Sequence, residues 1–166
     1  MNFKKIKLLD IAIDISYGLS LSADTKKTNN KLLRITDIQN RSVDWSTVPY
    51  CTPKLTSKIK NYYLKNGDIV FARTGATTGK SYIITDCPDG AVFASYLIRV
   101  RVNESVFPKF LFYFFQTPFY WSQISSNSVG STTAGVNSTK LKGLRIPLPP
   151  IKTQKRIVSL LDRRRL

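Results

Sequence analysis

Short apolar runs alternate with turn-forming segments along the chain, a pattern typical of a domain built from many short strands. The two clearest runs, residues 69–71 and 82–84, lie on either side of residues 73–80, a loop that holds two glycines, three threonines and two cations. Both runs consist mainly of β-branched and aromatic residues, which favour strands. The pattern predicts a strand, a glycine- and threonine-rich loop, and a second strand.

Two other segments alternate between apolar and polar residues. Residues 32–38 predict a strand with Arg34 and Thr36 on one face, and residues 93–102 predict another. Residues 39–57 contain asparagine and proline breakers and are expected to be irregular.

Helices are indicated where proline begins a segment or where apolar residues recur at helical spacing. Pro108 and Pro118 suit the first turns of helices that end near residues 116 and 126. Residues 110–115 are apolar all round the first of these helices, which indicates core rather than a platform for stacking bases. Near the amino terminus, residues 6–15 fit helical and strand spacing alike, and Asp10 is placed to cap a short helix that ends at Tyr17 and Gly18.

Many strand signals separated by hairpin-length gaps, with only three or four helical signals, predict an α/β (α+β) fold. We expect a twisted, largely antiparallel sheet with flanking helices. Thr153 is expected to cap a last helix with an apolar stripe of Ile157, Val158, Leu160 and Leu161. Because the three prolines between residues 147 and 150 stiffen the chain ahead of it, this helix is expected to project away from the domain.

The loop at residues 73–80 resembles a nucleotide-binding loop but does not meet its requirements. Only three residues separate Gly75 from Gly79, whereas the motif has four, and a strand rather than a helix is expected to follow. Without a helix amino terminus, no dipole faces a pyrophosphate. The loop can still bring amides, hydroxyls and positive charge to a phosphate oxygen.

The net charge of the chain indicates what kind of partner it binds. The 166 residues carry 26 Lys and Arg against 10 Asp and Glu, a formal net charge of +16. This excess favours a polyanionic partner, with nucleic acid ahead of an anionic membrane.

The sequence presents no catalytic residue, because there is no histidine and no paired carboxylates occupy a loop. The two cysteines, Cys51 and Cys87, lack partner ligands, and we expect no metal and no cofactor.

A second loop, residues 125–139, repeats the glycine, threonine and alanine content of the first. From residue 140 to the end the chain has nine cations and one acid, a net charge of +8. The amino terminus lacks the pattern of a signal peptide, so the chain is expected in the cytoplasm.

Four sequence stretches occur in this order along the chain: LLRITDIQN, NGDIVFARTGATTGK, GSTTAGVNSTKLKGLRIPLPP and IKTQKRIVSLLD. In this order they resemble a target-recognition domain of the specificity (S) subunit of type I restriction–modification enzymes. The resemblance covers residues 6–162 and implies a non-catalytic subunit that reads one half of a bipartite DNA site. It also implies partners: double-stranded DNA, a methyltransferase subunit and, through it, an endonuclease subunit.

The resemblance implies two regions, a target-recognition domain at residues 1–150 and the start of a spacer helix at residues 151–166. Family members usually carry two recognition domains separated by long helices, so this chain is expected to be a half-length subunit, a truncated product or a fragment. The glutamate usual before the glutamine at the helix start is Thr153 here.

Candidate residues follow from the loops, the charge and the resemblance together. Hydroxyl and amide side chains can read base edges, arginine can pair with guanine, and lysine can contact phosphates. The candidate DNA-binding residues are Arg34, Thr36, Arg73, Thr74, Thr77, Thr78, Lys80, Ser131, Thr132, Thr133, Asn137, Lys140, Lys142 and Arg145.

The apolar stripe of the last helix is the candidate subunit contact, and weak self-association through it is also expected. Two other functions fit the residues. Basic charge alone suits a nucleic-acid-binding protein without sequence specificity, such as a ribosome-associated factor. The last helix and the aromatic residues suit a module that assembles other subunits.

Overall fold

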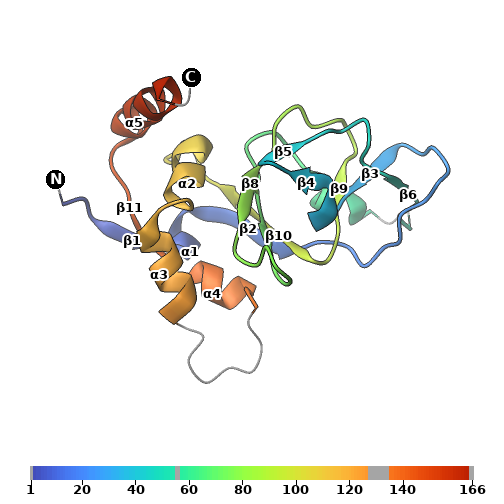
Figure 1. Ribbon diagram of the computed structural model, residues 1–166, viewed down its shortest axis with the longest axis horizontal. Coiled ribbons are helices and arrows are strands. Elements are labelled where there is room, and N and C mark those ends of the chain that lie inside the picture. The colour runs from blue at the N-terminus through green and yellow to red at the C-terminus, as the bar shows by residue number, and fades with distance from the viewer. Residues whose placement is uncertain (1, 55–56, 127–134, 165–166) are drawn as a thin grey trace.

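The helices gather at one end of the molecule and most of the strands at the other (Figure 1). The computed structural model describes residues 2–54, 57–126 and 135–164. Among these residues, no helix is long and apolar enough to cross a membrane. The helices are α1 (Leu8–Ile11), α2 (Pro108–Phe114), α3 (Pro118–Ser126), α4 (Ser138–Lys142) and α5 (Ile151–Arg163), with 3-10 helices η1 (Ile35–Asp37) and η2 (Ile59–Tyr62).

The central sheet has four strands in the order β2-β10-β7-β8, and each neighbouring pair is antiparallel. These strands are β2 (Ala12–Tyr17), β7 (Ile69–Ala72), β8 (Ser81–Ile83) and β10 (Leu97–Val102). All four residues of β7 are buried, which explains why this strand is an unbroken apolar run rather than an alternating one. The predicted strand, loop and strand around residues 73–80 are therefore confirmed.

Smaller sheets flank the central one. β3 (Asn30–Leu33) lies between β6 (Tyr50–Cys51), which is antiparallel to it, and β9 (Val92–Phe93), which is parallel. β4 (Ile38–Gln39) and β5 (Ser42–Val43) form a hairpin, and β1 (Lys5–Lys7) pairs with β11 (Arg145–Pro147). Among these named strands only β3 and β9 pair in parallel. This confirms the predicted α+β fold with a largely antiparallel sheet and flanking helices.

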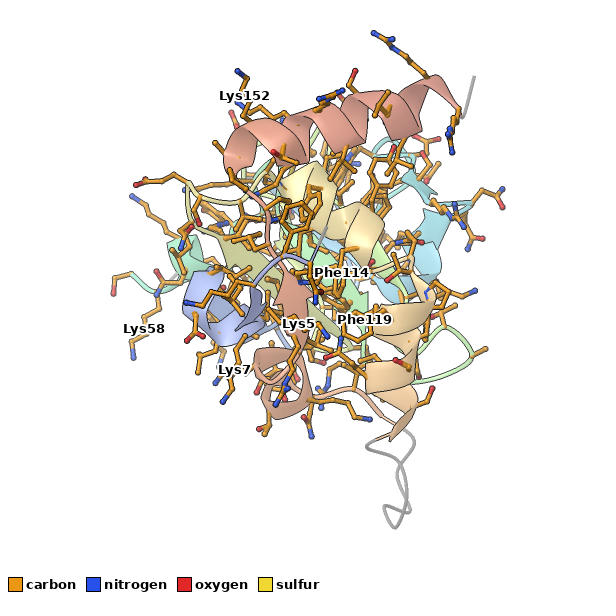
Figure 2. All side chains as sticks on the ribbon, turned by 90° about the vertical axis from the view of Figure 1, so that its left-hand side faces the viewer. Lys5, Lys7, Lys58, Phe114, Phe119 and Lys152 are labelled. Atoms are coloured by element: carbon orange, nitrogen blue, oxygen red, sulfur yellow. The ribbon has the colours of Figure 1, made fainter. Side chains whose placement is uncertain are left out.

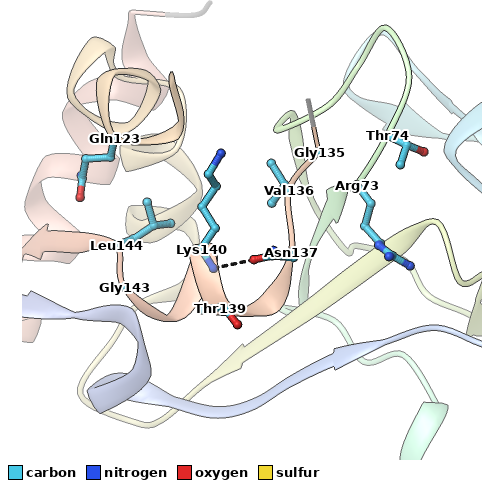
Figure 3. Close-up of a pocket in the computed structure, with 10 residues that line it drawn as sticks. All are labelled: Arg73, Thr74, Gln123, Gly135, Val136, Asn137, Thr139, Lys140, Gly143 and Leu144. Carbon is cyan, nitrogen blue, oxygen red and sulfur yellow. Dashed lines mark hydrogen bonds between the residues drawn. The ribbon is translucent and has the colours of Figure 1, made fainter. Parts of the chain in front are cut away.

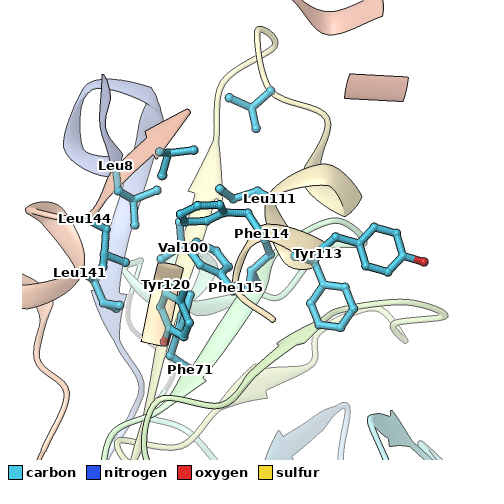
Figure 4. Packing of buried hydrophobic residues seen from close by; sticks show 14 of the residues in the cluster. Leu8, Phe71, Val100, Leu111, Tyr113, Phe114, Phe115, Tyr120, Leu141 and Leu144 are labelled. Carbon is cyan, nitrogen blue, oxygen red and sulfur yellow. The ribbon is translucent and has the colours of Figure 1, made fainter. Parts of the chain in front are cut away.

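The aromatic residues of α2 and α3 pack against the central sheet (Figure 4). The ring of Phe115 meets that of Phe71 edge-on with centroids 4.8 Å apart, and it lies 5.2 Å from the ring of Tyr120. Each of residues 110–115 is buried, so the interpretation of this run as core is confirmed. Edge-to-face aromatic pairs add to the free energy gained by burying these large side chains.

Two expected strands are shorter than the alternation indicated. Arg34 donates three hydrogen bonds to the carboxylate of Asp37, from its backbone N–H (2.8 Å), Nε (3.0 Å) and Nη2 (2.8 Å). This local contact turns the chain into η1, so β3 ends at Leu33, and the prediction of a strand with Arg34 and Thr36 on one face is wrong. The segment at residues 93–102 divides into β9 and β10, which belong to different sheets, because the chain turns where Leu97 N–H donates to the Ala94 carbonyl.

Near the amino terminus, where the sequence fits both helical and strand spacing, a short helix is followed by a strand. α1 is a single turn, its N-cap residue is Lys7, and β2 follows directly, so Asp10 caps nothing and no helix reaches Tyr17. Pairing with β10 along residues 12–17 makes these residues a strand.

The last helix does not project away from the domain, and this expectation is wrong. α5 begins at Ile151 after Pro150, not at Thr153, and it lies against α2 (Figure 2). Asp162 accepts hydrogen bonds from Lys109 Nζ (2.8 Å) and from the Tyr113 hydroxyl. The apolar stripe therefore faces the domain: Val158 is buried, Ile157 and Leu161 pack on the core, and Leu160 stays 52% exposed.

Candidate nucleic-acid interface

The loop at residues 73–80 folds back tightly between β7 and β8. Gly75 and Gly79 have φ values of 80° and 84°, which L-residues with side chains rarely adopt. Gly79 N–H donates to the Ala72 carbonyl (2.9 Å), and the Thr78 hydroxyl donates to the Gly75 carbonyl (2.6 Å). The hydroxyl of Thr78 is thus used within the loop, while Thr74 is exposed. A strand follows the loop, as expected, so it is not a nucleotide-binding loop.

Arg73 joins this loop to several neighbours. Its Nη1 donates to the Ser95 carbonyl (2.8 Å), and its guanidinium lies over the Tyr17 ring, 4.4 Å from the centroid. Its backbone carbonyl accepts the N–H of Val136 (3.0 Å), which fastens the second loop to the first. Arg73 is therefore held in place by the protein rather than extended freely toward a base.

The second loop ends in α4, and Asn137 caps this helix. Its Oδ1 accepts the N–H of Lys140 (2.8 Å), while Lys140 Nζ donates to the carbonyl of Ile124 at the end of α3 (3.0 Å). The candidate residues Ser131, Thr132 and Thr133 lie outside the described residues.

The two loops meet at a cleft of about 650 Å³, here called the first cleft (Figure 3). Its described lining holds cationic, hydroxyl and amide side chains and no acidic one: Arg73, Thr74, Gln123, Gly135, Val136, Asn137, Thr139, Lys140, Gly143 and Leu144. Such groups donate to phosphate oxygens and can both donate to and accept from base edges. The first cleft thus brings together four candidates, Arg73, Thr74, Asn137 and Lys140.

The other candidates lie around it. Thr77 and Lys80, which belong to the same loop, line a different cleft. Lys142 is half-buried at the end of α4, and Arg145 is exposed on β11. Arg34 and Thr36 lie at η1, with the Arg34 guanidinium paired to Asp37.

Tyr17 and Gln123 belong to this site but carry no signal in the sequence. Ser138 N–H donates to the Tyr17 hydroxyl (3.0 Å), so one tyrosine holds both Arg73 of the first loop and α4 of the second. Partial burial opposes ionisation, but the hydrogen bonds with Ser138 and the charges of Arg73 and Lys142 outweigh it and lower the pKa of Tyr17. The Gln123 amide pairs with the backbone of Arg145, accepting its N–H at 2.7 Å and donating to its carbonyl at 3.0 Å.

Removing the Tyr17 hydroxyl is expected to loosen the contact between the loops. Tyr17→Phe keeps the ring under Arg73 and deletes the acceptor for Ser138, at a cost of about 1 kcal/mol in the free energy of unfolding. Thermal unfolding followed by circular dichroism should show the midpoint fall by about 2–4 °C. Tyr96→Phe, the same change at a residue that is 62% exposed, is the control and should leave the midpoint unchanged. Equal midpoints for both variants would show that the hydroxyl does not hold α4.

Metal binding and thiol chemistry can be checked among the described residues. None of their His, Cys, Asp and Glu side chains form a group of three that could hold a metal ion. Burial raises the pKa of both Cys51 and Cys87 to about 11, so neither thiol is an activated nucleophile near neutral pH.

Comparison with known proteins assigns the chain to a family. Residues 2–164 match the model of the type I restriction modification DNA specificity domain. The chain is 29% identical to a putative type I restriction enzyme MjaX specificity subunit of Methanocaldococcus jannaschii, over 94% of this chain and 38% of the relative. It is 24% identical to the type I restriction enzyme EcoKI specificity subunit of Escherichia coli K12, over 96% of this chain and 35% of the relative.

Solved structures share the fold. The HsdS subunit from Thermoanaerobacter tengcongensis superposes with a TM-score of 0.67 and 18% identity, over 98% of this chain and 37% of that one. A chain from a structure of type I R-M complex assembly superposes with a TM-score of 0.73 and 18% identity, over 99% of this chain and 38% of that one. The match to the family model over nearly all residues, together with this shared fold, shows that the chain belongs to the type I restriction modification DNA specificity domain family.

Proposed function

We propose that this chain binds double-stranded DNA sequence-specifically and reads one half of a bipartite site for a type I restriction–modification system. The observation that carries the proposal is the first cleft, where two distant glycine- and threonine-rich loops meet without an acidic side chain. The chain spans less than two fifths of each of the relatives named above, all of which are specificity subunits.

Ion pairing inside the domain leaves the positive charge at this surface uncompensated. In the described part of the chain, four acids are already paired with cations: Asp14, Asp37, Asp68 and Asp162. Phosphates would meet the remaining cations, and the exposed side chains of Thr74, Asn137 and Thr139 would meet base edges. Arg73 then acts by holding both loops in position rather than by reaching a guanine.

On this proposal the chain is a non-catalytic cytoplasmic subunit that directs a methyltransferase subunit and, through it, an endonuclease subunit. Residues 1–150 form the target-recognition domain, and residues 151–166 begin a spacer helix whose first turns rest on α2. Leu160 and Ile151 are exposed apolar side chains of α5 and are available for a partner subunit or a second copy.

Selection of bound duplexes from a random pool tests the proposal directly. A single enriched sequence supports sequence-specific recognition. Uniform binding of all duplexes would instead identify a general nucleic-acid-binding protein, and no binding of DNA would leave an assembly module.

Reversing the charges of Lys80 in the first loop and of Lys142 at the end of α4 is expected to weaken DNA binding strongly. In the Lys80→Glu, Lys142→Glu variant, we expect the slope of log K against log salt to fall by about two, because two phosphate contacts are lost. Affinity should fall alike for every duplex, since phosphate contacts carry no sequence information.

The matched control is Lys152→Glu, Lys155→Glu, which makes the same change in net charge on the exposed face of α5. Binding titrations at several salt concentrations should show a smaller effect for this control, because exposed charges beyond a Debye length are screened. Equal losses for the two variants would contradict an interface at the loops.

A further inference from the structure

A second cleft, of about 510 Å³, is also lined by residues of the loop at residues 73–80. Residues of η1 and of the β4–β5 hairpin line it as well. The described lining again contains cations, hydroxyls and amides but no acid: Ile35, Ile38, Gln39, Asn40, Arg41, Ala72, Thr77, Lys80, Ser81, Tyr82, Gln116 and Trp121. The loop therefore contributes residues to two clefts, each of which contains cationic side chains.

The hairpin presents Arg41 in an unusual conformation. Gln39 pairs with Ser42, so Asn40 and Arg41 form a two-residue turn, with φ values of 51° and 62°. Turns of this kind favour asparagine followed by glycine, because both residues need positive φ. An arginine in the second position is strained relative to glycine, and residues with strain of this kind cluster at sites that bind ligands.

The two cations of the second cleft have no partners among the residues that the structure describes. Neither the Arg41 nor the Lys80 side chain forms a hydrogen bond or an ion pair with a described residue. In contrast, Arg34 binds Asp37, Arg73 binds the Ser95 carbonyl, and Lys140 binds the Ile124 carbonyl. Arg41 and Lys80 are thus free to bind an anion.

Part of the lining is apolar. Tyr82 and Ala72 are buried, and Ile35, Ile38 and Trp121 are half-buried. A ligand that carries anionic oxygens on an apolar framework would satisfy both parts. The sugar–phosphate backbone of DNA has this composition, with phosphates alternating with the C–H faces of deoxyribose.

We propose that the second cleft binds the backbone of the same DNA whose bases are read at the first cleft, with Arg41 and Lys80 on its phosphates. This inference rests on the proposed function and adds Arg41 to it. The loop at residues 73–80 would then contribute both to a cleft that reads bases and to a cleft that holds the backbone.

Arg41→Gly separates binding from folding. Glycine adopts a positive φ without strain, so the thermal midpoint should stay at or above that of the wild type. At the same time the phosphate contact disappears, and the slope of log K against log salt should fall by about one, with equal weakening for all duplexes. Arg41→Lys keeps the charge and should keep most of the slope, and Lys152→Gln is the control for the loss of one remote cation.

The measurement uses the full chain, a fluorescent duplex and copies of that duplex with one neutral methylphosphonate at successive positions. We expect one position that weakens the wild type but has no further effect on Arg41→Gly. An unchanged salt slope for Arg41→Gly would overturn the inference, as would a loss confined to one sequence, which would indicate base reading. Sequence-specific binding of duplex DNA by the wild type would leave the proposed function standing in either case, whereas the absence of any DNA binding would overturn both.

Discussion

Gln154→Leu is expected to lower the free energy of unfolding by about 3–4 kcal/mol, because it removes three hydrogen bonds that a fully buried side chain makes to the backbone. The Gln154 side chain is fully buried. Its Oε1 accepts the N–H of Phe107 (2.8 Å), and its Nε2 donates to the carbonyls of Ser105 (2.9 Å) and Pro149 (2.8 Å). One amide therefore ties the first turn of α5 to the segment that leads into α2.

Urea denaturation monitored by tryptophan fluorescence measures this cost. Ser159→Leu adds the same side chain at an exposed position of the same helix and should change stability by no more than about 0.5 kcal/mol. If Gln154→Leu proved as stable as this control, α5 would not be anchored through the amide. A loss of the expected size would mean that α5 and the rest of the domain unfold together.

The elements that the sequence predicts well have local causes. β7 is recognisable because burial on both faces requires apolar residues throughout, and the glycines at 75 and 79 mark the turn that follows it. Proline at the first position marks α2 and α3. In each case the segment itself contains the signal.

The errors arise where a contact between segments decides the structure. Apolar and polar residues continue to alternate through Arg34 and Ile35. The hydrogen bonds from Arg34 to Asp37 nevertheless end the strand at Leu33. The prolines before α5 are compatible with a helix that points in any direction. The direction is set by the buried Gln154 and by Asp162, which bonds to Lys109 on α2.

The candidate site follows the same division. Both loops are recognisable from their glycine, threonine and cation content, and the structure places parts of both at the first cleft. Tyr17 on β2 and Gln123 on α3 come from distant elements and have no local signature. The turn at Arg41 cannot be recognised from the sequence either, because an asparagine–arginine pair does not match the asparagine–glycine signal of a two-residue hairpin turn.

The second large effect is expected at the buried guanidinium of Arg99, whose side chain is 2% exposed. It donates to Asp14 Oδ2 through Nε (3.0 Å) and Nη2 (2.7 Å), and to the carbonyls of Tyr63 (3.0 Å) and Asn61 (2.7 Å). Asp14→Ala removes the counter-charge and leaves the cation buried. Breaking such a pair costs about 3–5 kcal/mol. Because the Asp14 side chain is 34% exposed and water can reach the gap, we expect the lower end of this range.

Two further substitutions separate charge from geometry. Asp14→Asn keeps an oxygen acceptor without the charge and should be destabilised less than Asp14→Ala. Asp10→Ala removes an exposed carboxylate from α1 and controls for the general effect of losing one negative charge in a chain of net charge +16. In denaturant titrations, Asp14→Ala should be the least stable variant, Asp14→Asn should be intermediate, and Asp10→Ala should be close to wild type. If Asp14→Ala matched Asp10→Ala in stability, the backbone carbonyls alone would suffice to hold the guanidinium of Arg99.

The stability of this ion pair also affects the interface, because Asp14 and Tyr17 both belong to β2. A weaker attachment of β2 to β10 would displace Tyr17, the residue that joins the two loops.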